Sequence, residues 1–397
     1  MFFLLFPVPC YNNSDVNTNK IMQTFYQLKS LFIKVPFQEI ENEFNELPKN
    51  VISGLNQQIQ ALPCHPKYVK ILQSTLEEAL CQWQENPEAN ELVILSSSIE
   101  PLSQIIQTAL VNWSHESVKD IKLLSWSNRP KDFLKIVSKL QNDLGLSARL
   151  DVDGNSGKFQ ELIVIPCLEF CFLRHIHGLD GIEFLRNRIF QDNSRFWLIG
   201  CNSLTWQYLD YIYNINSYFE KTLLLPTMTG EELMEWLTPV FTKMEFQKND
   251  LDEEKQVAKM QEYFDYLSHT SQGLSSAASQ LWLKSLSMIN TENLDSQETE
   301  KENILVEYHQ IKSLDLPELS SSDRYLLFSM LLHKEINLSH LALSLGESES
   351  RIQFQIQKLL SMGVIQRLNN LLTIHPTYYP KLRKHLKNYN FITDLIE

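Results

Sequence analysis

Five short apolar runs between residues 91 and 226 constrain the fold of this chain more than any other feature. They are ELVILS at 91–96, IKLLSW at 121–126, ELIVIP at 161–166, RFWLIGC at 195–201 and KTLLLP at 221–226. A helical pattern follows each of the first four, over 101–113, 130–144, 168–190 and 204–213. Strands that alternate with helices indicate a parallel sheet with helices on both faces. Because the runs are continuously apolar, both faces of the strands are expected to be buried.

Helical patterns stand on both sides of this region. Before it, apolar residues recur at helical spacing over 19–35 and 65–84. After it, the pattern at 229–244 begins with Thr229 and has Glu232 three residues later, which is the spacing of a capping box. Two more helical patterns follow, and the polar stretch 290–303 is typical of a linker.

The last segment predicts three helices and a β-hairpin. The helices are expected at 320–336, 337–346 and 347–363, and two short apolar runs surround Asn369 and Asn370. This arrangement predicts a winged helix-turn-helix. The predicted organisation is therefore an N-terminal helical region (1–88), an α/β domain with a five-stranded parallel sheet (89–228), a helical lid (229–290), a linker (291–318) and the winged helix (319–397).

Composition excludes some functional classes. The chain has 397 residues, is 43% hydrophobic and has a net charge of −13, which argues against a surface that attracts nucleic acid over its whole area. Its six cysteines show no repeated CxxC spacing, which favours reduced thiols and a cytoplasmic location. The apolar start, MFFLLFPVPC, is too short to span a membrane. We therefore expect a soluble protein without an integral membrane segment.

Residues 85–375 resemble P-loop ATPases of the AAA-like or STAND type. The resemblance rests on LIVIPCLEFCFLR at the third strand, FWLIGCNSLTWQYL at the fourth and LLLPTMTGEELMEWL at the turn into the lid. These stretches are similar to those of uncharacterised cyanobacterial ATPase-like proteins. The resemblance implies a phosphate-binding loop after the first strand, an acidic strand for Mg²⁺ and a polar sensor residue after the fourth strand.

The phosphate-binding loop departs from the family pattern. GxxxxGK[ST] surrounds phosphates with backbone amides and a lysine, whereas LSSSIEPLS contains neither glycine nor lysine. The loop carries Ser96, Ser97, Ser98 and Glu100. A carboxylate at Glu100, just before Pro101, suits the start of the following helix and occupies the position that a phosphate requires. Anion binding by the serine hydroxyls and amides is the alternative, but the chain has only 11 glycines.

The other nucleotide motifs are altered as well. Gly157 and Lys158 lie in a stretch that precedes a strand, whereas a phosphate loop follows one, so 153–159 is interpreted as a surface turn. The acidic strand ends in Pro166 and Cys167, with only Glu169 after it. Asn202 matches the sensor position and is equally typical of a cap at a strand end. We therefore predict no catalytic residue and no bound cofactor.

Two groups of residues, one of cysteines and histidines and one of arginines, allow further interpretations. Cys167, Cys171 and Cys201, with His175 and His177 nearby, could hold zinc, but buried thiols that pack as small apolar groups are the favoured interpretation, so no metal is predicted. Four arginines could be remnants of arginine fingers, although a solvated surface is the default for them: Arg174, Arg186, Arg188 and Arg195.

The winged helix could contact DNA or a protein. Residues 321–397 carry nine Lys and Arg and six Asp and Glu, a net charge of +3. The residues available for contact are Arg351, Gln353, Gln355, Gln357 and Lys358 in the recognition helix and Lys381, Arg383, Lys384 and Lys387 beyond the wing. So few cations favour a protein partner over DNA, to which binding is expected to be weak. Three hypotheses follow: a non-catalytic regulatory or scaffolding protein, a DNA-binding regulator, and a divergent active ATPase. Assembly into an oligomer is left open.

Overall fold

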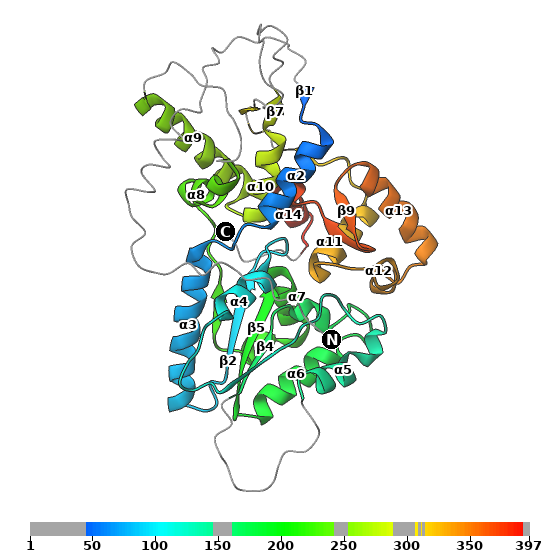
Figure 1. The fold of residues 1–397 in the computed structure, drawn as a ribbon. Coiled ribbons are helices and arrows are strands. Elements are labelled where there is room, and N and C mark those ends of the chain that lie inside the picture. Colours follow the sequence, from blue (N-terminus) through cyan, green and yellow to red (C-terminus); the bar gives the residue numbers. More distant parts are fainter. Residues whose placement is uncertain are drawn as a thin grey trace, which may run out of the picture.

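A parallel sheet of five strands forms the centre of the molecule (Figure 1). The computed structural model describes residues 45–145, 161–241, 253–288, 306–308, 311 and 314–391. The strands are β2 (Glu91–Ser96), β3 (Asp120–Leu123), β4 (Glu161–Ile165), β5 (Arg195–Asn202) and β6 (Thr222–Leu224). Their order in the sheet is β3-β4-β5-β2-β6, and every neighbouring pair is parallel. The predicted α/β class is confirmed.

Helices cover both faces of the sheet, which explains why the strands are apolar without alternation. Leu92 and Ile94 face α3 (Pro66–Glu85) and α4 (Leu102–Leu110). Val93 and Leu95 face the opposite core, which contains α5 (Ile136–Asp143), α6 (Asp180–Gln191) and α7 (Ser203–Tyr213). Right-handed crossovers require this division: α4 leads from β2 to the far edge at β3, whereas α5, α6 and α7 lead back in the other direction.

The prediction of one helix over 168–190 is wrong, because the middle of this segment is not helical. The chain forms a short 3₁₀ turn, η2 (Leu168–Cys171), and becomes helical again only at Asp180. Between them it doubles back, with the Leu173 amide donating to the Gly178 carbonyl at 2.8 Å. A Cβ atom at Gly178 would lie 2.1 Å from the Leu173 carbonyl oxygen, so this close approach requires glycine. Another 3₁₀ turn, η1 (Phe133–Lys135), begins the helical segment before β4.

Three helices follow the sheet: α8 (Gly230–Phe241), α9 (Glu253–Ser271) and α10 (Ser275–Lys284). Helices α8 and α10 contact α2 (Lys49–Gln60), and α9 packs against α8 and α10 (Figure 1). The predicted capping box at the start of α8 is confirmed. The Thr229 amide donates to Glu232 at 2.9 Å, and the Glu232 amide donates to the Thr229 hydroxyl at 3.3 Å. A small antiparallel sheet joins β1 (Asn45–Glu46), β7 (Leu286–Met288) and β8 (Val306–Tyr308). The predicted helix at 19–35, the turn at 153–159 and the polar stretch 290–303 lie outside the described residues.

The C-terminal elements are three helices, a hairpin and a final helix. They are α11 (Ser321–His333), α12 (Leu338–Leu345), α13 (Glu349–Ser361), β9 (Ile365–Leu368), β10 (Leu371–Ile374), the 3₁₀ turn η4 (Pro376–Tyr378) and α14 (Tyr379–Asn388). The hairpin turns at Asn369 and Asn370, whose φ angles of 49° and 67° suit the tight two-residue turn that matches strand twist. Ile336 forms a β-bridge with Leu372, which ties the segment after α11 to the hairpin.

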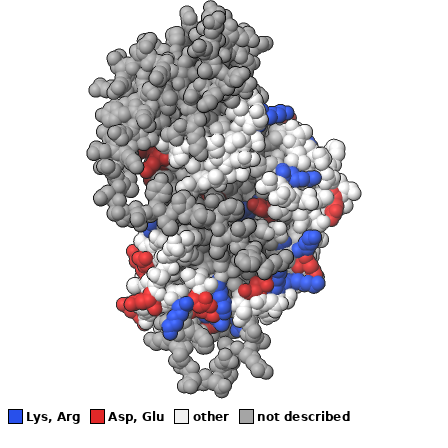
Figure 2. Space-filling model, viewed as in Figure 1, with Lys and Arg blue, Asp and Glu red and all other residues white. Residues whose placement is uncertain are grey.

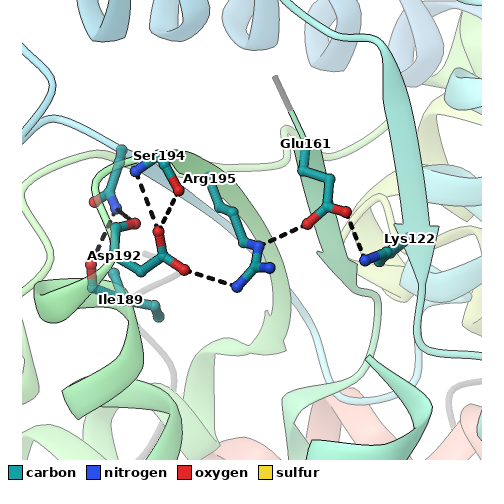
Figure 3. A network of polar contacts seen from close by, with 7 residues as sticks. Lys122, Glu161, Ile189, Asp192, Ser194 and Arg195 are labelled. Carbon is teal, nitrogen blue, oxygen red and sulfur yellow. Dashed lines mark hydrogen bonds and ion pairs between the residues drawn. The ribbon is translucent and has the colours of Figure 1, made fainter. Parts of the chain in front are cut away.

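Charged side chains on the described surface are mixed in sign. Figure 2 shows Lys and Arg interspersed with Asp and Glu around the lower part of the molecule. At the amino ends of the strands, Glu161 lies between Lys122 and Arg195, at 2.5 and 2.6 Å (Figure 3). Within the residues that the structure describes, no helix is both long and apolar enough to cross a membrane.

Candidate functional site

The order of the strands creates a switch point between β2 and β5. These strands are neighbours, but the helices that follow them, α4 and α7, lie on opposite faces of the sheet. In open α/β sheets, ligands bind outside the carboxyl ends of the strands at such a point. Three of the candidate residues meet here. The backbone amide of Asn202 donates to the Glu169 carboxylate at 2.5 Å, and the Ser203 hydroxyl donates to the Ser96 carbonyl at 3.1 Å.

The C-terminal end of α11 covers this switch point. The Thr205 hydroxyl donates to the Leu332 carbonyl, and the Asn202 side-chain amide lies 3.5 Å from the Leu331 carbonyl oxygen. Lys334, just after the helix, donates from Nζ to the Glu100 carbonyl oxygen at 2.9 Å. Its φ of 61° and ψ of −63°, with the Glu335 amide 2.7 Å from the His333 carbonyl, describe a strained γ-turn. The protein's own chain therefore occupies the place where a ligand of this fold class binds.

The sequence predicted that the Glu100 carboxylate favours the start of the following helix, but in the structure its hydrogen bonds go elsewhere. Helix α4 begins at Leu102 and has no side-chain cap. The carboxylate instead accepts hydrogen bonds from the Ser275 hydroxyl at 2.6 Å and the Ser276 amide at 3.1 Å, at the N-terminus of α10. Glu100 is 5% exposed, and its burial raises the pKa of the carboxyl group. The Glu100 side chain is therefore engaged in a tertiary contact with α10 rather than in a cap of α4.

The three serines of the loop are buried and mostly bonded within it. The Ser96 hydroxyl donates to the Ser97 carbonyl at 3.2 Å, and the Glu100 amide donates to the same carbonyl at 3.1 Å. The Ser97 hydroxyl lies 3.5 Å from the Ile99 amide. Ser98 Oγ has no hydrogen-bond partner among the residues that the structure describes, and Ser98 lines a cavity of about 170 Å³ between the loop and the hairpin. Lys334 and Glu335 both line that cavity, so its charged lining residues are of opposite sign.

The side chains of Glu169 and Asn202 are hydrogen-bonded to other residues of the protein. Glu169 accepts a hydrogen bond from the Cys167 thiol at 3.0 Å, in addition to the Asn202 amide. Asn202 caps α7, because its side-chain oxygen accepts from the Thr205 amide at 2.7 Å. The interpretation of Asn202 as a cap is thus supported by geometry.

Cys167, Cys171 and Cys201 are buried free thiols. Burial, followed by the nearby Glu169 carboxylate, raises the pKa of all three. Thiolates are the form that binds metals, so this environment disfavours metal binding. Within the described part of the chain, no three His, Cys, Asp or Glu side chains are arranged to hold a metal ion.

Sequence reasoning missed the buried Arg129 and His333. Arg129 is 3% exposed and donates to the Phe172 carbonyl, to the Glu169 carbonyl at 2.6 Å and to His333 Nδ1 at 3.1 Å. Burial lowers the pKa of Arg129 to about 10. Burial and the neighbouring Arg129 also hold the pKa of His333 well below its usual range, so a neutral ring accepts the hydrogen bond. Arg129 lies in the polar sequence SNRPKDF, which is typical of an exposed loop, so the sequence carried no signal of its burial.

The comparisons with known proteins assign no family. No protein-family model and no curated protein matches the chain. Among solved structures, Cdc6p from Pyrobaculum aerophilum is 11% identical over 91% of this chain and 100% of its own, with a TM-score of 0.27. The ORC2 protein of Aeropyrum pernix, solved with ADPNP and ADP, is 12% identical over 89% and 96%, with a TM-score of 0.28. Both likenesses are too weak to carry an argument.

The arginines considered as remnant fingers have partners elsewhere. Arg174 donates to the Ser344 carbonyl at 3.1 Å, Arg186 lies 4.0 Å from Glu183, and Arg195 belongs to the network at the amino ends of the strands. Arg188 also takes part in an interaction. The structure therefore places Arg174 at the contact between the sheet and the C-terminal elements, and Arg195 at the edge of the sheet opposite the switch point.

The candidate contact residues of the C-terminal elements are largely paired. On α13, Arg351 pairs with Glu347 at 3.0 Å and Lys358 pairs with Asp323 at 2.8 Å. Gln353 and Gln355 are half-buried, whereas Gln357 is exposed. Beyond the hairpin, Lys381 pairs with Asp315 at 2.5 Å, and Arg383 donates to Gln272 at 3.1 Å. Lys384 and Lys387 are exposed. Sequence analysis did not single out Phe354 of α13, which has 76% of its surface exposed.

Proposed function

We propose that this chain is a non-catalytic, ATPase-like protein that acts as a regulatory or scaffolding module through protein–protein contacts. One observation carries the proposal. The loop after β2, where a P-loop ATPase binds phosphate, holds a buried carboxylate that is hydrogen-bonded to α10. An anionic phosphate placed there would meet Glu100 and would find no lysine within the loop.

The contacts around the loop support the loss of a nucleotide-dependent cycle. In an ATPase of this type, the nucleotide joins the loop to the lid and to neighbouring elements. In this chain, Ser275 and Ser276 of α10 join the loop through Glu100, and Lys334 joins it from the end of α11. These hydrogen bonds are made by the polypeptide itself, so the elements are held together without a ligand.

The surface of α13 supports a protein partner rather than DNA. Both of its cations are in ion pairs, which reduces the charge available to neutralise phosphates. Phe354 exposes 76% of its surface between them. Aromatic side chains are enriched at protein interfaces relative to the rest of the surface.

Measurements on one preparation test the proposal. Calorimetry with ATP and Mg²⁺ should show no binding, and the nucleotide should leave the free energy of unfolding unchanged. A ligand at about 100 times its Kd would add about 2.7 kcal/mol to that free energy, so the measurement is sensitive. Micromolar binding, or hydrolysis above background, would refute the non-catalytic assignment.

Affinity capture tests separately the proposal that the chain acts through protein–protein contacts. Proteins that co-purify with the wild-type chain should be lost with Phe354→Ser and retained with Tyr266→Ser, a matched change of a 45% exposed aromatic residue on α9. If Phe354→Ser retains every partner, α13 is not the contact surface.

A further inference from the structure

A groove lined by aromatic side chains lies between α7 and the C-terminal elements. Its volume is about 410 Å³, and its aromatic walls are Tyr208 and Tyr211 of α7, Tyr325 and Phe328 of α11, and Tyr389 and Phe391 near the end of α14. We call it the tyrosine groove. Tyr211 is 80% exposed, Tyr325 is 54% exposed and Tyr389 is 51% exposed. A cluster of large exposed aromatic rings marks a binding surface, because folding alone gives no reason to gather them in water.

The rings at the base of the groove hold one another in place. The Phe391 ring packs against Tyr325 at 5.1 Å and against Phe328 at 5.2 Å between centroids. On the other wall, Tyr208 stacks with the buried Phe172 at 6.5 Å. The groove is therefore preformed, which limits the entropy lost when a ligand binds.

The charged side chain that lines the groove and the one that stacks on its Tyr389 wall are both arginines. Arg174 lines it, the Arg324 guanidinium lies 3.8 Å from the centre of the Tyr389 ring, and no Asp or Glu is among the described residues that line it. Helix α14, which leads directly into Tyr389, contains Lys384 and Lys387 and no acidic residue. The groove thus differs in sign from the chain as a whole, whose net charge is −13.

We propose that the tyrosine groove binds single-stranded nucleic acid. Bases would stack on Tyr211 and Tyr325, and the backbone phosphates would lie near Arg174 and near Arg324, which covers the Tyr389 ring. Aromatic platforms beside a positive surface are the shared chemistry of proteins that bind single strands. This surface is separate from α13, and the inference does not rest on the proposed function.

The charge distribution selects this ligand over an acidic, proline-rich peptide. Aromatic grooves recognise proline-rich segments through ring contacts and need no extended row of cations. Here Arg174 and Arg324 lie at the groove and α14 carries further lysines in the segment that leads to Tyr389, which matches a ligand that carries a charge at every unit. A duplex keeps its base faces stacked inside, so it offers nothing for the tyrosines to stack against.

Fluorescence anisotropy with the full chain tests the proposal. The probes are a labelled oligothymidylate of about 12 nucleotides, a duplex of equal length and an acidic proline-rich peptide. The single strand should bind best, and its affinity should fall as salt rises. Tyr211→Ala should weaken single-strand binding about 5-fold to 100-fold. Tyr211→Phe should bind like the wild type, because it keeps the ring, and Tyr266→Ala, on α9, should also be unchanged.

Four results would overturn the inference. They are no binding of the single strand, equal binding of the duplex, wild-type affinity of Tyr211→Ala for the single strand, and preferential binding of the peptide that Tyr211→Ala abolishes. The last result would assign the groove to a protein partner.

Discussion

Glu100 is buried in the loop after β2, and the ionisation of its carboxyl group makes the stability of the protein depend on pH. Burial raises its pKa above the ordinary value of 4.5, so between these two values the folded state binds a proton that the unfolded state has lost. The stability that the carboxyl group contributes is therefore fully present below pH 4.5 and is lost as the pH rises through the raised pKa. Glu100→Gln, which stays neutral, should remove this fall in the free energy of unfolding, as urea denaturation across pH 4 to 8 would measure.

Glu100→Ala is the matching control for that residue. It leaves the Ser275 hydroxyl and the Ser276 amide without their acceptor, which should destabilise the fold by about 1–3 kcal/mol at every pH. Equal losses in Glu100→Gln and Glu100→Ala would show that the charge itself, rather than the hydrogen bonds, holds α10 to the loop.

At the amino ends of the strands, the stability that Glu161 contributes depends on pH in the opposite direction. Partial burial raises the pKa of Glu161, but hydrogen bonds from Lys122 on β3 and Arg195 on β5 outweigh it and lower the pKa (Figure 3). The resulting stability is present above pH 4.5 and is lost as the pH falls through the lowered pKa. Glu161→Gln should therefore lower the free energy of unfolding by about 1–2 kcal/mol at pH 7, and the difference should vanish in acid.

A control for the strand network is Glu183→Gln on α6, where an exposed carboxylate lies 4.0 Å from Arg186. Its effect should stay within about 0.5 kcal/mol at both pH values, because exposed pairs contribute little. If Glu161→Gln behaves like this control, the ion pairs across β3, β4 and β5 do not stabilise the sheet.

For the whole molecule, Arg129 joins the sheet to the C-terminal elements. Its guanidinium satisfies two carbonyl groups of the sheet domain and the His333 ring of α11. Arg129→Ala should destabilise the protein by about 3 kcal/mol or more, because it leaves buried acceptors unpaired. Hydrogen exchange should show α11 losing protection before β4 and β5. Arg351→Ala, which removes an exposed pair on α13, should change stability by less than about 0.5 kcal/mol.

Much of the secondary structure could be predicted from local patterns. The apolar runs identified all five strands. The central strands β2, β4 and β5 are buried on both faces as the runs predicted, whereas the edge strands β3 and β6 are partly exposed. Asn369 and Asn370 marked the hairpin because asparagine tolerates the positive φ that its turn requires. The pattern at 168–190 misled because Gly178 permits a chain reversal that depends on a contact with Leu173, which periodicity does not detect.

The sequence by itself determined that the loop after β2 lacks the lysine and glycines of a phosphate site, since a missing residue type is visible without coordinates. Only the tertiary structure decided which residues the loop contacts. Glu100 and Ser275 are 175 positions apart, and Arg129 and His333 are 204 apart. Pairings over such separations are set by the packing of whole helices against the sheet, so neither the burial of these charges nor the gathering of aromatic rings between α7 and α14 could be read from local sequence.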